Sequence, residues 1–390
     1  MSDFPVIMPV YNRAPLWFEK GEGAYLYDDK GDKYLDFVAG VAVVGLGHCN
    51  PRITEVLKKQ AETLWTVSNV FHTKVAETLA QKLVDNTFAD TVFFQNSGVE
   101  AWECCVKVIR KYFSSVGKPE KQRIIGFKGC FHGRSMTAIA ASKTEKMVGG
   151  FGNLIDCFDL AEWGDIGSIK NLITNKTAAI MIEPVLGEGG AKRPPEGFLK
   201  ELRKLCDEND LLLFFDEIQC GMGRTGKLFA HEWDGVVPDV MAVAKALGNG
   251  FPIGACLATA KAAQGMTKGT HGSTYGGNPL ATSVGLAVLN VMTEPGFMQK
   301  VCNTSEKFSI MLETVVKENP SVFSSVRGRG LLRGIECIVP NSEVAAALRN
   351  EKLLSIEAGE NVIRLLPPLT IEQYHIEEAY DKISKAVKRM

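Results

Sequence analysis

Two apolar segments that each end in a charged residue decide the fold: Leu211-Leu-Leu-Phe-Phe-Asp216 and Val240-Met-Ala-Val-Ala-Lys245. A strand buried on both faces of a parallel sheet reads as a continuous hydrophobic run. Both segments have this pattern, so they predict strands of an open α/β sheet. Ligands of such sheets bind beside the carboxyl ends of the strands. We therefore expect Asp216 and Lys245 to face one ligand.

An acid and an amine at neighbouring strand ends suit pyridoxal phosphate. The amine forms a Schiff base with this cofactor, and the acid keeps the pyridinium nitrogen protonated. For these two residues alone, an ion pair with a purely structural role is an equal alternative. The surrounding motifs must decide between the two readings.

The composition limits the class of protein. The 390 residues carry 44 basic and 45 acidic side chains, and this balance argues against a nucleic-acid-binding surface. No apolar run approaches the roughly 18 residues of a membrane span, and the N-terminus lacks the basic region of a signal peptide. The ten cysteines include no Cys-x-x-Cys pair, so we expect reduced thiols of a cytoplasmic protein, without a metal site or a disulfide framework.

Helical and strand patterns alternate from about residue 50, which predicts a mostly parallel sheet. An N-terminal hairpin precedes this region, in residues 24–37, and an α+β segment follows it. The expected strands of the sheet are 91–94, 123–127, 178–182, 211–215 and 240–244. The expected later elements are helices 299–319, 343–350 and 371–388 and a strand at 362–365.

A candidate anion site lies where the segment Phe93-Phe-Gln-Asn-Ser-Gly-Val-Glu100 leads from a strand into a helix. Ser97 and Glu100 have the spacing of a capping box. Gly98 permits close approach of a ligand to the backbone, and a helix N-terminus attracts anions. An ordinary capped helix without a ligand is the commoner meaning of this motif.

A second glycine motif, Gly221-Met-Gly-Arg-Thr-Gly226, matches the pattern of dinucleotide-binding loops. Such a loop should follow its strand at once and open a helix. Here residues 216–220 intervene, and no helix of adequate length is predicted to follow. We therefore expect a glycine-rich loop without a bound dinucleotide.

Seven motifs in order resemble the class III pyridoxal-phosphate aminotransferases, which have fold type I. The resemblance covers essentially the whole chain. Within the family it is greatest to members that act on acetylornithine, through residues 36–42, 46–48, 68–71 and 271–274. The seven motifs are Asn96-Ser-Gly-Val-Glu-Ala101, Phe131-His-Gly-Arg134, Ile182-Glu-Pro-Val-Leu-Gly-Glu-Gly-Gly190, Phe215-Asp-Glu-Ile-Gln219, Ala244-Lys-Ala-Leu-Gly-Asn-Gly250, His271-Gly-Ser-Thr-Tyr-Gly-Gly-Asn-Pro279 and Ile363-Arg-Leu-Leu-Pro-Pro368.

This resemblance implies an α/β fold with two domains. The large cofactor-binding domain, expected at residues 46–299, would contain a mostly parallel seven-stranded sheet flanked by helices. A small α+β domain would combine residues 1–45 with residues 300–390.

The resemblance also assigns residues to the cofactor ring. Lys245 would carry the cofactor as a Schiff base, and Asp216 would pair with the ring nitrogen. Gln219 would contact the phenolic oxygen, and Phe131 would stack on the ring. For His132 we expect a role in positioning the loop.

The cofactor's phosphate would lie at the start of the helix after Ser97. The resemblance implies backbone N–H contacts from Gly98 and Val99, and a contact from Thr274 of the partner subunit in a homodimer. The family usually has Thr where this chain has Val99, so one hydroxyl contact is missing. We expect only a modestly weaker hold on the cofactor.

Four further residues would bind substrates. Arg134, assisted by Ser273, would hold the carboxylate far from the reacting amine. Arg364 would bind the α-carboxylate of glutamate. Glu188 would pair with Arg364 when the other substrate is present, because an unpaired arginine is costly in a dry site.

The implied reaction moves the terminal amine of N2-acetylornithine to 2-oxoglutarate. Succinylornithine, succinyl-diaminopimelate, ornithine and 4-aminobutyrate remain alternative amine donors. An aminomutase of the same fold needs no carboxylate switch, so Glu188 and Arg364 argue against it. A non-enzymatic cofactor-binding module is disfavoured by the complete set of Lys245, Asp216 and Arg134.

Overall fold

The centre of the structure is a seven-stranded sheet. The computed structural model describes residues 5–390. Five neighbouring strands, β9, β8, β7, β5 and β6, run parallel to one another. Strand β10 runs antiparallel to both of its neighbours, β4 and β9. The prediction of a mostly parallel sheet is confirmed. In spatial order its strands are β4 (Thr91–Gln95), β10 (Gly254–Ala258), β9 (Val240–Val243), β8 (Leu212–Asp216), β7 (Thr177–Ile182), β5 (Arg123–Phe127) and β6 (Phe158–Ala161).

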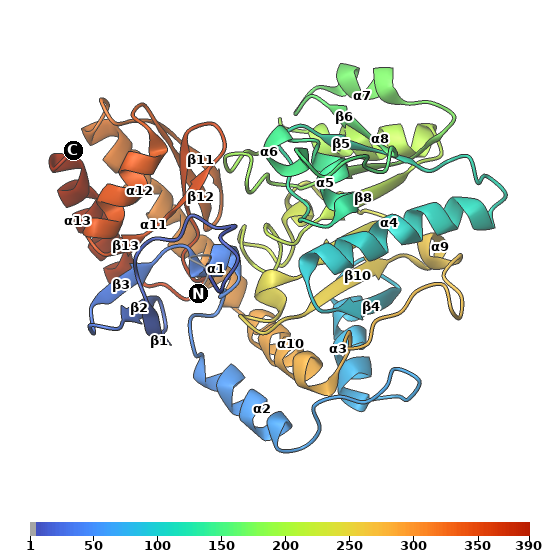
Figure 1. The fold of residues 1–390 in the computed structure, drawn as a ribbon, viewed down its shortest axis with the longest axis horizontal. Coiled ribbons are helices and arrows are strands. Elements are labelled where there is room, and N and C mark those ends of the chain that lie inside the picture. The colour runs from blue at the N-terminus through green and yellow to red at the C-terminus, as the bar shows by residue number, and fades with distance from the viewer. Residues whose placement is uncertain (1–4) are drawn as a thin grey trace.

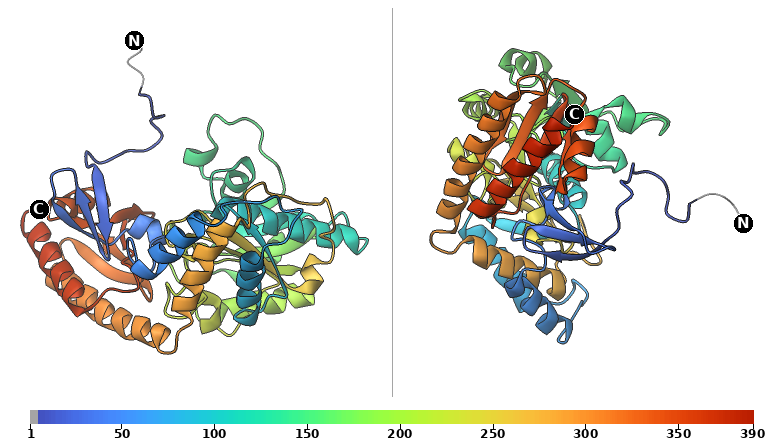
Figure 2. Two further views of the ribbon diagram at one scale, coloured as in Figure 1. Left: turned by 90° about the horizontal axis from the view of Figure 1, so that it is seen from below. Right: turned by 90° about the vertical axis from the view of Figure 1, so that its left-hand side faces the viewer.

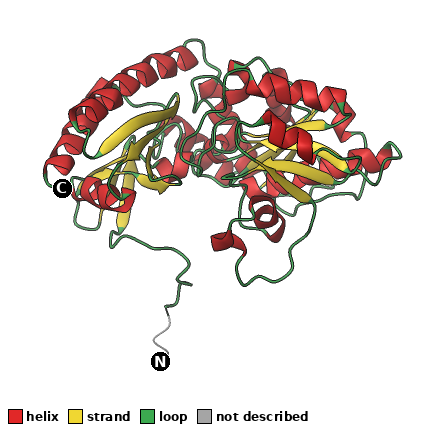
Figure 3. Ribbon diagram, turned by 90° about the horizontal axis from the view of Figure 1, so that it is seen from above, coloured by secondary structure: helices red, strands yellow, loops and turns green. Residues whose placement is uncertain are grey.

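Helices cover both faces of this sheet (Figure 3). Successive strand residues point to opposite faces, so Phe214 and Phe215 of β8 are both fully buried in different apolar clusters. One face packs against α4 (Gly98–Ser115), α5 (Met136–Ser142) and α9 (Ala260–Ala263). The other packs against α3 (Lys74–Asp85), α7 (Ile166–Leu172), α8 (Phe198–Glu208) and α10 (Pro279–Met292), with α2 (Pro51–Ala61) against α10.

The two ends of the chain fold together beside the large sheet. Strand β13 (Leu353–Leu354) pairs in parallel with β3 (Lys33–Asp36) and thereby completes a sheet with β1 (Phe18–Glu22) and β2 (Tyr25–Asp28). Figure 1 shows these blue strands beside the orange and red C-terminal elements. Those elements are an antiparallel sheet of β11 (Phe323–Arg329), β12 (Leu332–Cys337), β15 (Val362–Leu365) and β14 (Ile356–Ala358), with helices α11 (Phe297–Glu318), α12 (Asn341–Asn350) and α13 (Gln373–Lys388).

Short elements complete the fold: α1 (Ala39–Ala42), α6 (Glu145–Val148) and the 3₁₀ turns η1 (Ala230–Trp233) and η2 (Lys245–Leu247). Residues 5–17 extend away from the folded body (Figure 2), and their side chains are largely exposed. The expected element types are observed, with ends shifted by one or two residues. Helix α11 starts before the expected domain boundary at residue 300, and both domain boundaries stay predictions.

Among residues 5–390, no helix combines the length and apolar character that crossing a membrane requires. All ten cysteines belong to this described part of the chain, and each has a free thiol. The glycine motif at residues 221–226 forms a turn-rich loop, followed by only one turn of 3₁₀ helix in η1. This geometry differs from a dinucleotide-binding loop, which opens a full helix.

Candidate functional site

The ends of β8 and β9 bring Asp216 and Lys245 to one cavity of about 180 Å³. The two strands are parallel neighbours, and Asp216 lies opposite Ala242 in their register. The chain leaves β9 at Val243, so Lys245 follows directly beyond the strand end. The carboxyl ends of adjacent parallel strands lie at the same edge of a sheet, so the acid and the amine share the crevice there.

Lys245 has a strained backbone, and its side-chain amine is an unusually weak base. Its φ of 47° lies in the left-handed region, which is uncommon for residues other than glycine and clusters at functional sites. Burial, followed by the positive charge of Arg364, lowers the pKa of Lys245 to about 8. An amine with this pKa has a minor neutral fraction near physiological pH, but this fraction is far larger than that of an ordinary lysine. It can therefore act as a nucleophile and as a proton carrier.

A buried histidine holds Asp216 in place. The Nδ1–H of His132 donates to Oδ2 of Asp216 across 2.6 Å, and the N–H of Ile218 donates to Oδ1 across 3.1 Å. The His132 ring stacks on Trp102 at 5.4 Å between centroids. Burial alone would lower the pKa of His132, but Cys130 and Asp216 outweigh it and hold the pKa well above its ordinary value. The Asp216 carboxylate is thus fixed in the wall of the cavity.

Glu183 is a site residue that the sequence analysis did not select. Its carboxylate lies in the same cavity and accepts the N–H groups of Phe131 at 2.9 Å and Gly187 at 3.1 Å. Burial raises the pKa of Glu183 to about 7. This residue therefore ties the loop that carries Phe131 to the loop that leads to Glu188. Its position after the buried run Ala178–Ile182 was the available signal, because it too follows a strand end.

The N-terminus of α4 opens onto the same cavity through Gly98 and Val99. Ser97 Oγ caps the helix by accepting the N–H of Glu100, and the Glu100 carboxylate accepts the N–H of Asn96. Within residues 5–390 no group accepts the N–H of Gly98 or Val99, as expected for the first turn of a helix. A Cβ on Gly98 would lie 2.9 Å from Cγ2 of Ile218, so a larger residue there would crowd the site.

Arg364 closes the other end of the site. It is fully buried on β15, donates Nη1–H to Oε1 of Gln219 across 2.6 Å, and pairs through Nη2 with Oε1 of Glu188, also at 2.6 Å. Glu188 is partly exposed, with 36% of its side-chain surface accessible. The Nε of Arg364 has no acceptor among the described residues. The pair thus combines an immobile arginine with an acid that has room to move.

A second cavity, of about 490 Å³, adjoins the first and shares Phe131 as a wall. Arg134 and Glu188 also line it. The Arg134 guanidinium lies 5.6 Å from the centroid of the Phe131 ring and is otherwise exposed. A substrate entering here would meet an arginine at the outer end and Lys245 at the inner end.

Ser273 and Thr274 do not line either cavity in this chain. Ser273 Oγ accepts Nδ2–H of Asn96 at 3.3 Å, next to the α4 cap, and the N–H of Gly276 at 2.9 Å. Thr274 is exposed. The structure therefore brings together the other ten predicted residues around two joined cavities and leaves this pair outside. The ten are Ser97, Gly98, Val99, Phe131, Arg134, Glu188, Asp216, Gln219, Lys245 and Arg364.

These residues fit pyridoxal phosphate. The cavity offers an amine with a lowered pKa for an aldehyde, a fixed carboxylate for a ring nitrogen and an aromatic wall at Phe131. The free N–H groups at the start of α4 suit a phosphate, because a helix N-terminus carries partial positive charge. Gln219 uses its oxygen for Arg364, which leaves its NH₂ group available as a donor.

Comparison with known proteins agrees with this geometry. An acetylornithine aminotransferase from Brucella melitensis is 51% identical over 100% of this chain and 98% of its own length. Among solved structures, an N-acetylornithine aminotransferase from Stenotrophomonas maltophilia is 37% identical with a TM-score of 0.86, covering 97% of both chains. An ornithine aminotransferase from Toxoplasma gondii is 32% identical with a TM-score of 0.94, covering 98% of this chain and 93% of that chain.

The family model for class-III aminotransferases matches residues 7–387, which span both joined cavities and both ends of the fold. The solved relatives share this architecture over nearly the whole chain. The motifs at Lys245, Asp216 and Arg364 therefore occur in the structural context that the family requires. This chain belongs to the class-III aminotransferases.

Proposed function

We propose that this chain transfers the terminal amine of N2-acetyl-L-ornithine to 2-oxoglutarate with pyridoxal 5′-phosphate as cofactor. The products are N-acetyl-L-glutamate 5-semialdehyde and L-glutamate, a reaction of arginine biosynthesis. Relatives named acetylornithine aminotransferase, 51% identical over the full chain, support the choice of substrate. The observation that carries the proposal is the ion pair between Arg364 and Glu188 close to Lys245.

The chain's own residues would hold the cofactor at its two ends. Asp216, fixed by His132, binds the ring nitrogen and keeps it protonated, because a nearby carboxylate favours the charged form. The N–H groups of Gly98 and Val99 bind the phosphate at the start of α4. When bound, the protonated ring accepts the electron pair that remains after a proton leaves the carbon beside the reacting nitrogen.

Lys245 supplies both the covalent attachment and the proton transfer. When it is not bonded to the cofactor, its Nζ would be free in the cavity. With a pKa of about 8, Nζ can accept a proton from the reacting substrate carbon and return it elsewhere. Phe131 and Glu183 form walls at this end of the cavity.

Arg364 and Glu188 solve the problem of two dissimilar substrates. Glutamate carries two carboxylates, and its α-carboxylate would bind Arg364 bidentately after displacing Glu188. Acetylornithine presents a neutral methylene chain near Arg364, so Glu188 would remain paired there. Removing the partner of a buried charge is strongly destabilising. Arg134, at the mouth of the outer cavity, would hold the distal carboxylate of either substrate.

We further propose that the active form is a cytoplasmic homodimer in which Thr274 of the partner subunit contacts the phosphate. An exposed apolar group supports this interface: Trp65, Phe71 and Tyr275 are each more than 60% exposed. Asn69 ties the two segments together by donating to the carbonyl groups of residues 273 and 276. Large exposed apolar patches mark interaction sites, and this one borders Thr274.

A substrate panel tests the proposal. The purified enzyme, loaded with cofactor, is assayed with 2-oxoglutarate and N2-acetylornithine, succinylornithine, succinyl-diaminopimelate, ornithine or 4-aminobutyrate. We expect the highest kcat/KM with N2-acetylornithine and formation of one glutamate per amine consumed. A higher kcat/KM for ornithine or 4-aminobutyrate would contradict the assignment. Turnover of an amine without 2-oxoglutarate would instead indicate an aminomutase.

A further inference from the structure

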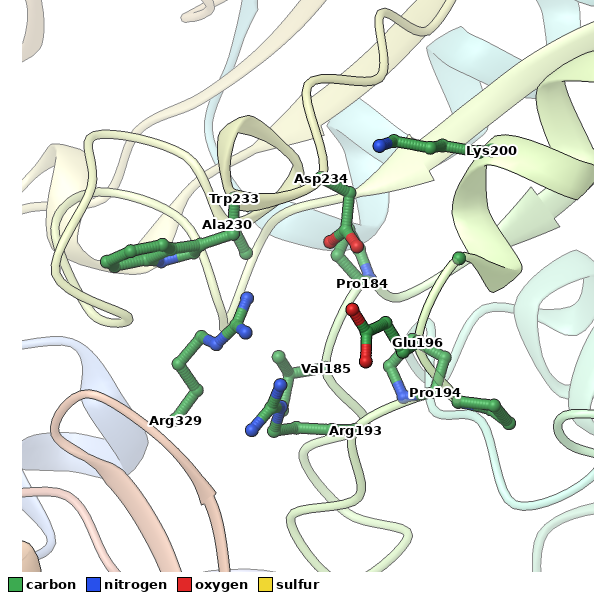
Figure 4. A pocket seen from close by; sticks show the side chains of 12 residues that line it. Pro184, Val185, Arg193, Pro194, Glu196, Lys200, Ala230, Trp233, Asp234 and Arg329 are labelled. Carbon is green, nitrogen blue, oxygen red and sulfur yellow. The ribbon is translucent and has the colours of Figure 1, made fainter.

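A third cavity, of about 400 Å³, lies away from the catalytic residues (Figure 4). Its walls come from the loop after β7, from the turn η1 and from the end of β11. It shares no lining residue with the two cavities around Lys245 and Arg134. Five charged side chains line it: Arg193, Glu196, Lys200, Asp234 and Arg329.

In the described part of the chain, these charged groups lack oppositely charged partners at bonding distance. Within residues 5–390, none of the five forms an ion pair within 4 Å or a side-chain hydrogen bond. The contrast is clear on β11 itself, where Arg327 pairs with Glu336 at 2.7 Å and with Glu360 at 2.6 Å. Arg329, two positions later on the same strand, has no carboxylate partner among the residues that the structure describes. Its charge is instead directed into the cavity (Figure 4).

The two arginines lie close enough to repel each other. Burial, and then the charge of Arg193, lowers the pKa of Arg329, while Asp234 acts in the opposite direction. The Arg329 guanidinium is held 4.9 Å from the centroid of the Trp233 ring, which leaves its edge free for an acceptor. Two adjacent guanidinium groups with free donors form a site for a carboxylate, whose oxygens match their planar geometry.

Acidic groups face the same space. The carboxylates of Asp234 and Glu196 point into the cavity alongside the guanidinium groups (Figure 4). These acids weaken the attraction of the cavity for a simple anion, and a simple amine would be repelled by the arginines and by Lys200. A molecule that carries one carboxylate and one ammonium group satisfies both sets. Trp233, which is 40% exposed, offers an apolar surface for a side chain.

We propose that this cavity binds a free α-amino acid as its zwitterion. The carboxylate lies between Arg193 and Arg329, and the ammonium group lies between Asp234 and Glu196. Because Arg329 comes from β11 and Asp234 from the turn after η1, the ligand joins the C-terminal sheet to the large sheet. Binding to the folded state alone therefore raises its stability. The proposal does not depend on the substrate of the catalytic site.

The test measures binding to the cofactor-loaded protein by calorimetry. The probes are glycine, L-leucine, L-glutamine and L-phenylalanine, which have no terminal amine, with acetate and methylamine as half-ligands. We expect saturable binding of at least one amino acid with a Kd of about 1–10 mM, which corresponds to a weak site, and a rise in Tm. Acetate and methylamine should each bind at least about ten-fold more weakly.

Two variants locate the site. Arg329→Gln and Asp234→Asn should each weaken amino-acid binding about ten-fold or more, because each removes one charged partner. Lys204→Gln, an exposed change one turn along α8 from Lys200, is the matched control and should bind normally. Binding should also persist in Arg364→Met, which disables the catalytic carboxylate site. Arg329 and Asp234 are partly exposed and have no ion-pair partner among residues 5–390, and Lys204 is exposed, so circular dichroism should report an unchanged fold.

Three results would overturn the proposal. The first is no saturable binding of any of the four amino acids. The second is equal binding of acetate and amino acid, which would indicate a simple anion site. The third is binding that survives both Arg329→Gln and Asp234→Asn but is lost in Arg364→Met, which would place the ligand in the catalytic cavity. Failure of the acetylornithine assay would leave all three readouts unaffected.

Discussion

Replacing Arg364 with methionine should separate the two half-reactions. Methionine fills much of the same volume without the charge, so the fully buried position keeps its packing. In the glutamate half-reaction the α-carboxylate loses a buried partner, which costs roughly 2–5 kcal/mol. That is about a 30-fold to several-thousand-fold loss in kcat/KM. Both half-reactions lose the hydrogen bond to Gln219, and beyond it the acetylornithine half-reaction loses only the pair with Glu188.

The smaller loss follows from the exposure of Glu188. Since 36% of its side-chain surface is accessible, Glu188 can turn towards water when Arg364 is absent. An ion pair with one solvated partner contributes about 0–1 kcal/mol, or at most roughly five-fold in kcat/KM. The predicted difference between the half-reactions is therefore about five-fold or greater.

Single-turnover absorbance of the cofactor, recorded with each amine substrate in turn, measures the two half-reactions separately. The control is Arg203→Met. Arg203 lies on α8, outside both cavities, and pairs with Asp239 at 2.7 Å. This variant should leave both rates close to wild type. Glu188→Gln should have the opposite selectivity to Arg364→Met, slowing acetylornithine while glutamate binds more tightly. Equal losses for both substrates in Arg364→Met would refute the switch.

Three further predictions address the amine, the phosphate and the assembly. In the cofactor-free protein, Lys245 has a pKa of about 8, against 10.5 for the ordinary side chain. Between these two pH values the unfolded chain binds more protons than the folded chain. The free energy of unfolding should therefore rise with pH in this range. The excess stability of Lys245→Met over wild type, measured by urea unfolding, should shrink from pH 7 to pH 10, and a constant difference would contradict the lowered pKa. Val99→Thr should slow cofactor dissociation, since an added hydroxyl bond to phosphate is worth about 1.5–3 kcal/mol; an unchanged dissociation rate would count against the phosphate position. Mixing Lys245→Ala with an inactive Thr274 variant should restore activity if subunits share sites, and no recovery after proven subunit exchange would exclude that arrangement.

The sequence by itself determined the sheet and the place of the catalytic pair. The runs before Asp216 and Lys245 are hydrophobic enough to require burial on both faces, and a parallel sheet places such strand ends at one edge. These signals are local or depend on a general topological rule. Motifs in family order extended them to Arg134, Glu188 and Arg364, but only by resemblance.

Only the tertiary structure decided which of these residues meet. Glu188 and Arg364 lie 176 positions apart, and Gln219 and Arg364 lie 145 apart, yet each pair is in hydrogen-bonding contact. No periodic pattern encodes such contacts, because they depend on how two sheets dock. The same holds for His132, whose bond to Asp216 spans 84 positions, and for Glu183, whose role appears only when its loop folds over the cavity.

The loop at residues 221–226 also has a role that its sequence motif does not indicate. Its glycines match a dinucleotide pattern, but Arg224 is buried there and donates to the carbonyl groups of Leu331 and Pro367. The loop thus joins the large sheet to the segment that follows Arg364. Sequence patterns indicate which structure each segment prefers. They do not show that the charge of Arg224 is buried against carbonyl groups more than 100 positions away, because that contact depends on the complete path of the chain.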